Sequence, residues 1–254
     1  MATAGKVYLV GAGPGAPDLL TLRAAHLLER ADIVFHDALM HPDTLAFAVR
    51  AEKVAVGKRC GKQSTAQRFI NKRLVDAAFR CGVVVRLKGG DPLLFGRAQE
   101  EIDALEQAGV ACEVVPGITA ALAASADVRT SMTRRGLSRN VAFVTPRAGR
   151  GENEHDWARS ILAADTGAIY MGAGEAEQIA ATLMARGVRP DLPVVVVENA
   201  SLPQSRRIAL PLSQLGAIAA SGITGPALIL LGEVYARAQG AVTATRDDFR
   251  TRVA

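Results

Sequence analysis

A stretch able to hold a small ligand through its backbone runs from Val83 to Arg97 and is centred on Gly89-Gly90-Asp91-Pro92. The β-branched and basic residues 83–88 predict a strand that ends at Gly89. Two consecutive glycines permit positive φ and leave no Cβ between the backbone and a ligand. Asp91 is able either to brace the turn or to accept hydrogen bonds from a ligand, and Pro92 ends the strand. The same composition also fits an ordinary strand-to-helix turn, so this motif does not decide the function by itself.

A second glycine-rich stretch, Gly11-Ala12-Gly13-Pro14-Gly15-Ala16, follows a short apolar strand predicted at residues 6–10. It matches the G-x-G-x-x-G/A fingerprint, so a dinucleotide-dependent oxidoreductase is one interpretation. In that fold the helix begins inside the glycine motif, and its N-terminus meets the pyrophosphate. Here Pro14 and Pro17 predict an irregular loop and delay the helix to about residues 19–30. The pattern therefore favours a ligand other than a pyrophosphate.

Charged side chains follow the other predicted strand ends. Asp37 comes just after a strand at residues 32–35, where a carboxylate either lies at the ligand edge of the sheet or caps a helix. Lys58 belongs to the basic loop 57–62, which suits an anion site or a solvated surface loop. Four arginines crowd a later loop: Arg129, Arg134, Arg135 and Arg139. These side chains are of the types that carry acid–base chemistry and bind carboxylates.

The composition limits the class of protein. With 254 residues, 49% hydrophobic and 22% charged, the chain is of ordinary globular composition and long enough for two modest domains. A net charge of +5 favours an acidic partner, either a small polyanion or a nucleic acid. An aromatic content of 4% supplies few side chains for base stacking, so we expect no nucleic-acid partner.

Metal, membrane and secretion signals are missing from the sequence pattern. The histidines and cysteines show no metal-ligand spacing, so we expect no metal. The longest uncharged run, residues 214–232, contains Gly216, Gly222, Gly225 and Pro226, which disfavour a membrane helix. The apolar run after Lys6 is too short for a signal peptide. We therefore expect a cytoplasmic protein with no membrane partner.

Predicted strands alternate with helices along the whole chain, which indicates the α/β class. The predicted strands cover residues 6–10, 32–35, 53–56, 83–88, 112–115, 141–145, 168–171, 194–198, 207–210 and 227–231. The predicted helices cover residues 19–30, 64–80, 99–108, 157–163, 175–185 and 211–219, and a further small-residue helix opens near Thr119 with N–H groups free to bind a ligand. The rhythm divides into an N-terminal α/β domain at residues 1–115, a C-terminal α/β domain at residues 116–236 and a polar, mobile tail at residues 237–254.

Several motifs coincide in the order typical of one family. They are Val10-Gly-Ala-Gly-Pro-Gly15, Asp37, Gly57-Lys58-Arg59, Val85-Arg-Leu-Lys-Gly-Gly-Asp-Pro92 with Phe95-Gly-Arg97, Val115-Pro-Gly-Ile-Thr-Ala120, Tyr170-Met-Gly172, Val197-Glu-Asn199 and Pro226-Ala-Leu228. On these motifs the chain resembles the tetrapyrrole methylase family over about residues 6–236. Within the family it is most similar to the branch that acts on uroporphyrinogen III.

The resemblance implies a fold and a reaction. It implies two α/β domains with the active site in the cleft between them, a homodimer, and S-adenosyl-L-methionine as methyl donor with S-adenosyl-L-homocysteine as product. The implied reaction methylates C2 and C7 of uroporphyrinogen III to give precorrin-2, which feeds cobalamin, sirohaem or haem d1. Another tetrapyrrole (precorrin) methyltransferase of the family is the alternative. We do not expect the additional dehydrogenase/chelatase module that sirohaem synthases of the family carry.

The resemblance also implies roles for individual residues. The positions matching the donor site are Pro14, Gly89, Gly90, Asp91, Leu94, Thr119, Ala120, Met171, Ala200 and Ala227. Asp37 matches the family's proton acceptor and Lys58 its proton donor, although an unperturbed lysine is a poor acid at neutral pH and better suited to binding substrate. The positions matching the substrate site are Arg97, Glu100 and Arg135. The chain departs from the family pattern at His36, at Ser131–Arg135, at Thr145–Arg147 and at Ala200.

Overall fold

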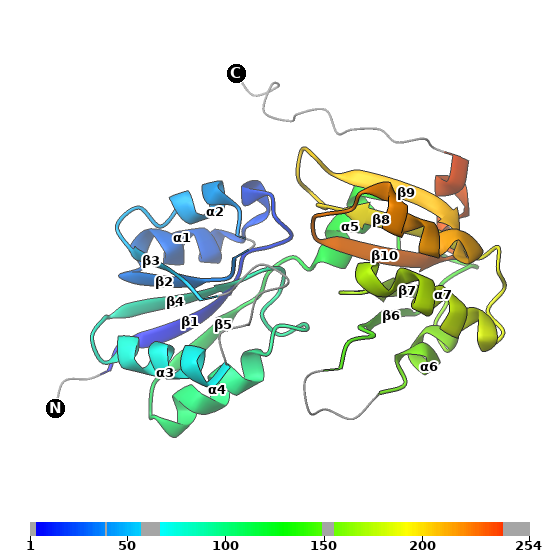
Figure 1. Ribbon diagram of the computed structural model, residues 1–254. Helices are drawn as coiled ribbons and strands as arrows, with labels where there is room; N and C mark the ends of the chain where they lie inside the picture. Colours follow the sequence, from blue (N-terminus) through cyan, green and yellow to red (C-terminus); the bar gives the residue numbers. More distant parts are fainter. Residues whose placement is uncertain (1–3, 39, 57–66, 149–154, 241–254) are drawn as a thin grey trace, which may run out of the picture. The chain divides into compact units, whose positions relative to one another are not determined.

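The structure is a computed structural model of the chain and describes residues 4–38, 40–56, 67–148 and 155–240. The chain divides into two compact units, Met1–Ala120 (unit 1) and Ala121–Ala254 (unit 2). Each unit contains its own five-stranded sheet with helices (Figure 1). The α/β class predicted from the alternation of strands and helices is confirmed.

The sheet of unit 1 is entirely parallel, with strand order β3-β2-β4-β1-β5. Its strands are β1 (Lys6–Gly11), β2 (Ile33–His36), β3 (Glu52–Ala55), β4 (Val83–Lys88) and β5 (Cys112–Val115). The central strand β4 has neighbours on both sides, which is why it begins with an uninterrupted run of valines. Since all five strands point the same way, the loops after them meet at one edge of the sheet, where such sheets bind ligands.

Helices cover both faces of this sheet (Figure 1). They are η1 (Pro17–Leu19), α1 (Leu22–Arg30), α2 (Pro42–Ala46), α3 (Gln67–Ala78) and α4 (Ala98–Gln107). Successive strand residues point to opposite faces. Phe35 and Val84 therefore pack under α3 and α4, whereas Val34 and Val85 pack under α1 and α2.

The sheet of unit 2 is mixed, with strand order β6-β7-β10-β8-β9. Its strands are β6 (Val141–Val144), β7 (Thr166–Ile169), β8 (Pro193–Glu198), β9 (Arg206–Pro211) and β10 (Ala227–Gly232). The pair β6–β7 is parallel, and the other pairs are antiparallel. The helical segments are α5 (Ala120–Val128), α6 (Trp157–Leu162), η2 (Ala173–Glu175), α7 (Ala176–Ala185), η3 (Leu212–Ser221) and η4 (Glu233–Gly240).

Each predicted strand has a counterpart in the structure, and the differences lie mainly in the helices. The first helix begins at Leu22 rather than at residue 19, because Pro17 starts a separate 3-10 turn and Thr21 caps α1. The helix predicted at 211–219 is the 3-10 segment η3. The short helix α2 was not predicted, and η4 continues through Gly240 into the segment predicted as a tail.

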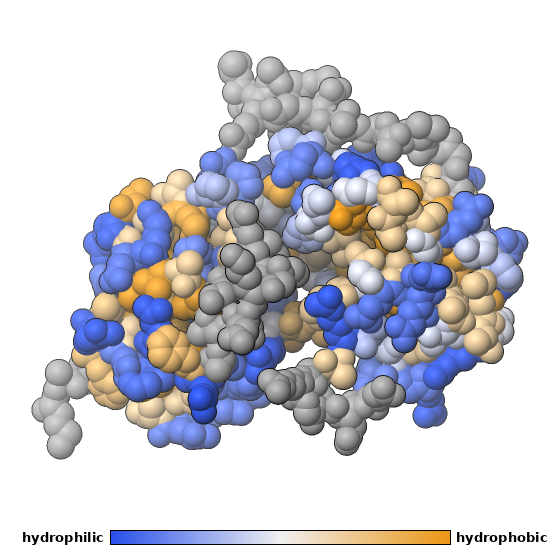
Figure 2. All heavy atoms as spheres, viewed as in Figure 1, coloured by the Kyte–Doolittle hydropathy of each residue, from blue (hydrophilic) through white to orange (hydrophobic). Residues whose placement is uncertain are grey.

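The surface mixes polar and apolar side chains. Exposed large apolar residues of unit 1 include Leu22, Phe69 and Phe79, and apolar atoms are interspersed with hydrophilic ones on the face shown in Figure 2. Of the helices in the described ranges, none combines the length and the apolar character needed to cross a membrane.

Candidate functional site

Three glycine-containing segments converge at the carboxyl ends of β1, β4 and β5 in unit 1. Gly90 N–H donates to the Gly13 carbonyl at 2.7 Å, and Gly13 N–H donates to the Gly90 carbonyl at 3.2 Å. A Cβ placed on Gly117 would lie 2.2 Å from the Gly90 carbonyl oxygen and 2.8 Å from Gly11 Cα. The three segments, remote in sequence, therefore form one backbone cluster, which a residue larger than glycine at position 117 would not permit.

The glycines in this cluster serve two different purposes. Gly11 and Gly117 allow chain segments to approach one another, so the close approach expected of the first glycine loop is partly to the chain itself. Gly90, with φ of 66°, is open: the atom nearest to its hypothetical Cβ is Thr119 Cα at 3.9 Å. At Gly89 the nearest is Met40 Cε at 3.4 Å. Gly89 and Gly90 thus present backbone without side chains, as the sequence predicted for a ligand-approaching turn.

Asp91 braces this cluster. Its Oδ1 accepts the Leu93 N–H at 2.9 Å, and its Oδ2 accepts the Gly117 N–H at 2.9 Å. Of the two uses considered for this carboxylate, bracing is therefore observed. It ties the turn after β4 to the segment after β5.

The geometry of the first glycine loop does not suit a dinucleotide. The loop runs into η1, and α1 begins at Leu22, where Thr21 Oγ1 accepts the Ala24 N–H at 3.1 Å. The helix N-terminus is thus capped by the chain and lies beyond the glycine motif. This confirms the delay predicted from Pro14 and Pro17 and removes the feature on which the oxidoreductase interpretation depended.

Asp37 immediately follows β2 and forms an ion pair with a buried arginine. Arg86 Nη2 donates to Asp37 Oδ1 at 2.7 Å, and the Asp37 side chain is 35% exposed. Arg86 Nε also donates to Glu101 Oε1 at 3.0 Å, and Lys88 Nζ donates to Glu101 Oε2 at 2.9 Å. Asp37 is therefore the solvent-accessible end of a buried chain of charges.

Burial and charge act in opposite directions on the two cations. Burial opposes the charge of Arg86, but Asp37 and Glu101 outweigh it and hold the pKa of this guanidinium above its usual value. Burial, together with the nearby Arg86, lowers the pKa of Lys88 in spite of the attraction of Glu101. This charged cluster was not predicted from the sequence. The pattern that could have indicated it is the pair of cations, Arg86 and Lys88, at alternate positions of an otherwise apolar strand.

The predicted substrate residues are exposed. Arg97, with φ of 55°, makes a bidentate ion pair with Glu100 at 2.6 and 2.8 Å. Arg135 lies in the turn closed by the bridge between Arg134 and Ser138. Lys58 lies outside the described residues.

The predicted donor residues fall on both units. Pro14, Gly89, Gly90, Asp91, Leu94, Thr119 and Ala120 belong to unit 1, and Met171, Ala200 and Ala227 belong to unit 2. Within unit 2, Asn199 N–H donates to the Pro226 carbonyl at 2.9 Å, which brings the segments of Ala200 and Ala227 together. The sequence predicted free N–H groups at the start of α5, but that of Ala121 donates to Tyr170 Oη at 3.2 Å because the two segments pack side by side.

Left-handed backbone marks the predicted site segments of unit 2. Met171, Asn199 and Ser201 have φ of 56°, 52° and 72°. Such conformations cost non-glycine residues about 1 kcal/mol or more and persist where the surroundings enforce them, often at ligand sites.

Two buried carboxylates hold these bends of unit 2. Glu198 Oε1 accepts the N–H groups of Thr224 and Gly225 at 2.8 and 2.7 Å, and its Oε2 accepts from Arg206 at 3.1 Å. Asp127 Oδ2 accepts the Ser201 N–H and the Ser205 hydroxyl, each at 2.8 Å. Glu198 belongs to the motif Val197-Glu-Asn199 but was given no role from the sequence, and Asp127 was not singled out, because only the fold shows which backbone groups they meet.

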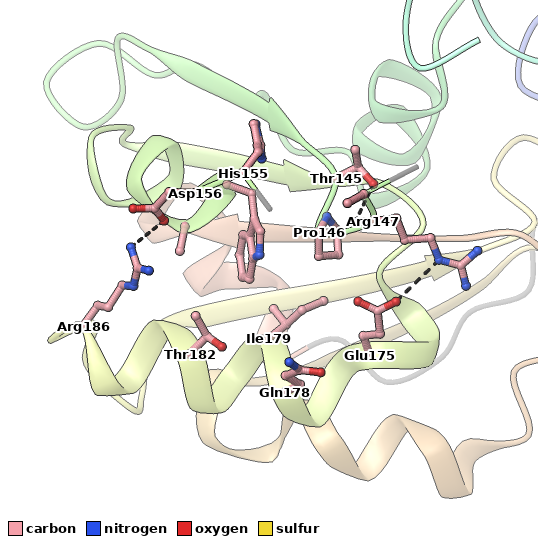
Figure 3. A pocket seen from close by; sticks show the side chains of 13 residues that line it. Thr145, Pro146, Arg147, His155, Asp156, Glu175, Gln178, Ile179, Thr182 and Arg186 are labelled. Atoms are coloured by element: carbon pink, nitrogen blue, oxygen red, sulfur yellow. Dashed lines mark hydrogen bonds and ion pairs between the residues drawn. The ribbon is translucent and has the colours of Figure 1, made fainter. Parts of the chain in front are cut away.

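A separate cavity of about 950 Å³ lies in unit 2 between α7, the segment after β6 and the start of α6 (Figure 3). Gln178, Ile179 and Thr182 face it from α7. Among the described lining residues, both arginines are paired, Arg147 with Glu175 at 3.6 Å and Arg186 with Asp156 at 2.5 Å. Carboxylates therefore already neutralise these two cations.

No group of three or more His, Cys, Asp or Glu side chains suited to a metal ion occurs within the described ranges.

The fold agrees with a comparison to known families. Residues 6–216 match the model of the tetrapyrrole (corrin/porphyrin) methylases. The chain belongs to this family.

Individual relatives have more specific names than the family model. The chain is 42% identical over 238 residues to a uroporphyrinogen-III C-methyltransferase from Paracoccus denitrificans, covering 92% of this chain and 83% of the relative. It is 44% identical over 231 residues to a siroheme synthase from Zymomonas mobilis, covering 91% of this chain and 49% of the relative. The chain spans about half the length of the siroheme synthases it matches.

Solved structures agree with the sequence relatives. The uroporphyrin-III C-methyltransferase from Thermus thermophilus, complexed with S-adenosyl homocysteine, is 41% identical with a TM-score of 0.78, covering 91% of this chain and 98% of that one. A cobalt precorrin-4 methyltransferase is 28% identical with a TM-score of 0.79, covering 89% of this chain and 94% of that one.

Proposed function

We propose that this chain is an S-adenosyl-L-methionine-dependent C-methyltransferase that methylates uroporphyrinogen III at C2 and C7 to give precorrin-2. The observation that carries the proposal is the similarity to uroporphyrinogen-III methyltransferases over most of the length of both partners. The glycine cluster and the oriented carboxylate at the edge of unit 1 supply the chemical features that such a reaction requires.

The open backbone at Gly89 and Gly90 fits a bulky methyl donor. Because no side chain projects from these positions, a ligand can contact the peptide groups directly. We propose that Pro14, Gly89, Gly90, Asp91, Leu94, Thr119 and Ala120 of unit 1 and Met171, Ala200 and Ala227 of unit 2 bind the donor. When bound, S-adenosyl-L-methionine supplies a methyl group on a positively charged sulfur. The protein contributes mainly by fixing reacting atoms at about 3–3.5 Å and in line.

Exposed cations fit the acidic macrocycle. We propose that Arg97 and Arg135 bind substrate carboxylates, with Glu100 holding Arg97 in place until they arrive. An arginine–carboxylate contact contributes about 1.5–3 kcal/mol when partly desolvated and about 0–1 kcal/mol at the surface. Lys58 is proposed as a further substrate-binding cation rather than a proton donor.

Asp37 is the proposed proton acceptor. Methylation of a pyrrole carbon requires loss of a proton from the ring system, and a carboxylate oriented at the ligand edge of the sheet suits that step. Its Oδ1 is held by Arg86. Among the described residues, its Oδ2 makes no hydrogen bond, so this oxygen is the one available to a substrate proton.

The homodimer implied by the family resemblance and the cytoplasmic location expected from the sequence are retained as proposals. Analytical ultracentrifugation of the purified chain tests the first: a species of twice the chain mass is expected.

Counting methyl groups tests the proposed reaction. The protein is incubated with uroporphyrinogen III and isotopically labelled S-adenosyl-L-methionine, and the product is analysed by mass spectrometry. Two transferred methyl groups on carbon are expected. A product with no label, or calorimetry showing that the chain binds NAD(P) and not S-adenosyl-L-homocysteine, would contradict the proposal.

Asp37→Asn tests the acid–base assignment. Because loss of a general base typically costs about 100-fold or more, the single-turnover rate should fall by at least that factor while the affinity for S-adenosyl-L-homocysteine is retained. Asp76→Asn, which makes the same change in an exposed ion pair with Lys72 on α3, is the control and should keep the full rate. A normal rate in Asp37→Asn would remove Asp37 from the mechanism.

A further inference from the structure

The side chain of Arg86 joins two elements of unit 1 that no backbone hydrogen bond connects. Through Nη2 it contacts Asp37 after β2, and through Nε it contacts Glu101 on α4. Its Nη1 donates to the Leu87 carbonyl at 3.0 Å. All three directions of the planar guanidinium are therefore occupied, which fixes its plane relative to the sheet.

Glu101 anchors the buried end of this arrangement. Its side chain is fully buried, and it accepts from Arg86, from Lys88 and from Gln67 Nε2 at 3.0 Å. Because both carboxylate oxygens have charged or amide donors, Glu101 has little freedom to change rotamer. Arg86 is thus held from behind by a side chain that is itself fixed.

The charges balance only when Asp37 is included. The buried part contains two cations, Arg86 and Lys88, and one anion, Glu101. An excess positive charge in a buried site is costly, and the Asp37 carboxylate at the mouth, paired with Arg86 at 2.7 Å, offsets it. This ion pair therefore favours one orientation of the Asp37 carboxylate.

We propose that Arg86, anchored by Glu101, is a positioning residue that fixes the Asp37 carboxylate with Oδ2 toward the substrate. The inference rests on the proposed function, in which Asp37 accepts a proton. It assigns a purpose to a charged residue in the central strand of a parallel sheet, where apolar residues are the norm. Lysine cannot replace arginine here, since an ammonium group cannot contact both carboxylates in the fixed geometry of a guanidinium.

The test compares Arg86→Lys and Glu101→Gln with the wild-type chain, using uroporphyrinogen III and S-adenosyl-L-methionine. For Arg86→Lys we expect kcat to fall about 10- to 100-fold, the size of effect that misplacing a reacting group produces. The KM for uroporphyrinogen III and the Kd for S-adenosyl-L-homocysteine should stay within about twofold, since positioning of a reacting group acts on the transition state. Glu101→Gln should give a smaller loss of kcat with the same pattern and provides the test if Arg86→Lys does not fold.

A double-mutant cycle separates positioning from general stability. In the Asp37→Asn background, Arg86→Lys should change kcat by less than about twofold, because a residue that acts through Asp37 has nothing left to position. A structural role would cost the same factor in both backgrounds. Arg189→Lys, the same change in an exposed ion pair with Asp191 and Glu233, is the control and should leave kcat unchanged.

Crystal structures provide a readout that does not depend on activity. In Arg86→Lys the Asp37 carboxylate should leave its single orientation. Wild-type kcat in Arg86→Lys, equal losses in both backgrounds, or an unmoved Asp37 would overturn the assignment of Arg86 while leaving the proposed function standing. Absence of methyl transfer by the wild-type chain would instead overturn the proposed function, and the inference with it.

Discussion

The two units build the bends that carry the predicted donor residues by different means. In unit 1, Gly11 and Gly117 allow the loops after β1, β4 and β5 to come into backbone contact, and a Cβ at either position would prevent the approach. In unit 2, Met171, Asn199 and Ser201 adopt left-handed backbone although they carry side chains. There the buried carboxylates Glu198 and Asp127 hold the loops through their N–H groups.

In unit 1 the carboxylate of Asp91 also ties two loops together, but the close approach of the backbone depends on steric space, whereas the bends of unit 2 depend on hydrogen bonds. A glycine bend fails when atoms are added, because the neighbouring backbone has nowhere to move. A carboxylate-held bend fails when one acceptor is removed, since buried N–H groups then lose their partners. The following changes address each kind of bend, from the largest expected effect to the smallest.

Gly117→Ala tests whether the glycine cluster of unit 1 tolerates an added methyl group. The added methyl group would lie 2.2 Å from the Gly90 carbonyl oxygen, so the loops after β4 and β5 must separate. We expect a loss of about 3 kcal/mol in the free energy of unfolding, the upper range for overpacking, together with loss of S-adenosyl-L-homocysteine binding. Thermal unfolding and calorimetry measure the two effects.

Gly174→Ala is the matched control, because no atom lies within 4 Å of the position of its Cβ. It should leave both the melting temperature and the donor affinity unchanged. Equal behaviour of the two variants would mean that the glycine cluster is not required.

Glu198→Gln tests whether the bend of unit 2 depends on the carboxylate that holds it. A glutamine amide has one accepting oxygen where Glu198 has two, so it cannot accept from Thr224, Gly225 and Arg206 together, and at least one of these donors loses its partner. The expected cost is about 2 kcal/mol in the free energy of unfolding, with faster amide hydrogen exchange at Thr224 and Gly225. Glu177→Gln on the exposed face of α7 is the control, and slow exchange in both variants would argue against this function of Glu198.

Met171→Gly separates backbone strain from ligand contact. Relief of the left-handed conformation and the greater freedom of glycine in the unfolded chain nearly cancel, so the free energy of unfolding should change by less than about 1 kcal/mol. The affinity for S-adenosyl-L-homocysteine should nevertheless fall, since the proposed contact is lost. An unchanged Kd in calorimetry would remove Met171 from the donor site.

Cys112 is the first residue of β5 and lies at the amino ends of the unit 1 strands, away from the glycine cluster at their carboxyl ends. Burial, reinforced by Glu101 and other acidic groups, raises the pKa of its thiol from 9.0 to about 11. The folded state thus binds the thiol proton more tightly than the unfolded state, and this contribution to stability is lost as the pH rises from about 9 to about 11. Alkylation at pH 8, followed by mass spectrometry, should leave Cys112 unmodified in the folded chain and modify it after denaturation; rapid modification of the folded protein would contradict this.

The regular features of the fold could be predicted from the sequence. Runs such as Val83–Val85 and Val194–Val197 identify buried strands, and Pro14 and Pro17 correctly delay the first helix to beyond the glycine loop. The 3-10 character of η3 was not predictable, since the apolar spacing of residues 212–221 fits either type of helix.

The residues that support the site could not be predicted from the sequence. Asp37 was predicted because it directly follows an apolar strand and matches the family's proton acceptor, whereas Arg86 and Glu101 meet through space across β4 and α4. Glu198 and Asp127 likewise serve backbone groups more than twenty residues away in sequence. A pattern in one segment indicates what a residue is able to do, but not which remote group it contacts.

A crystal structure of the chain with S-adenosyl-L-homocysteine tests most directly whether these bends hold the donor. We predict that the ligand contacts the backbone of Gly89 and Gly90 in unit 1 and lies against the segments of Met171 and Ala200 in unit 2. A ligand bound elsewhere, for example in the cavity lined by Gln178 and Thr182, with the backbone at Gly89 and Gly90 left open, would contradict the proposed site.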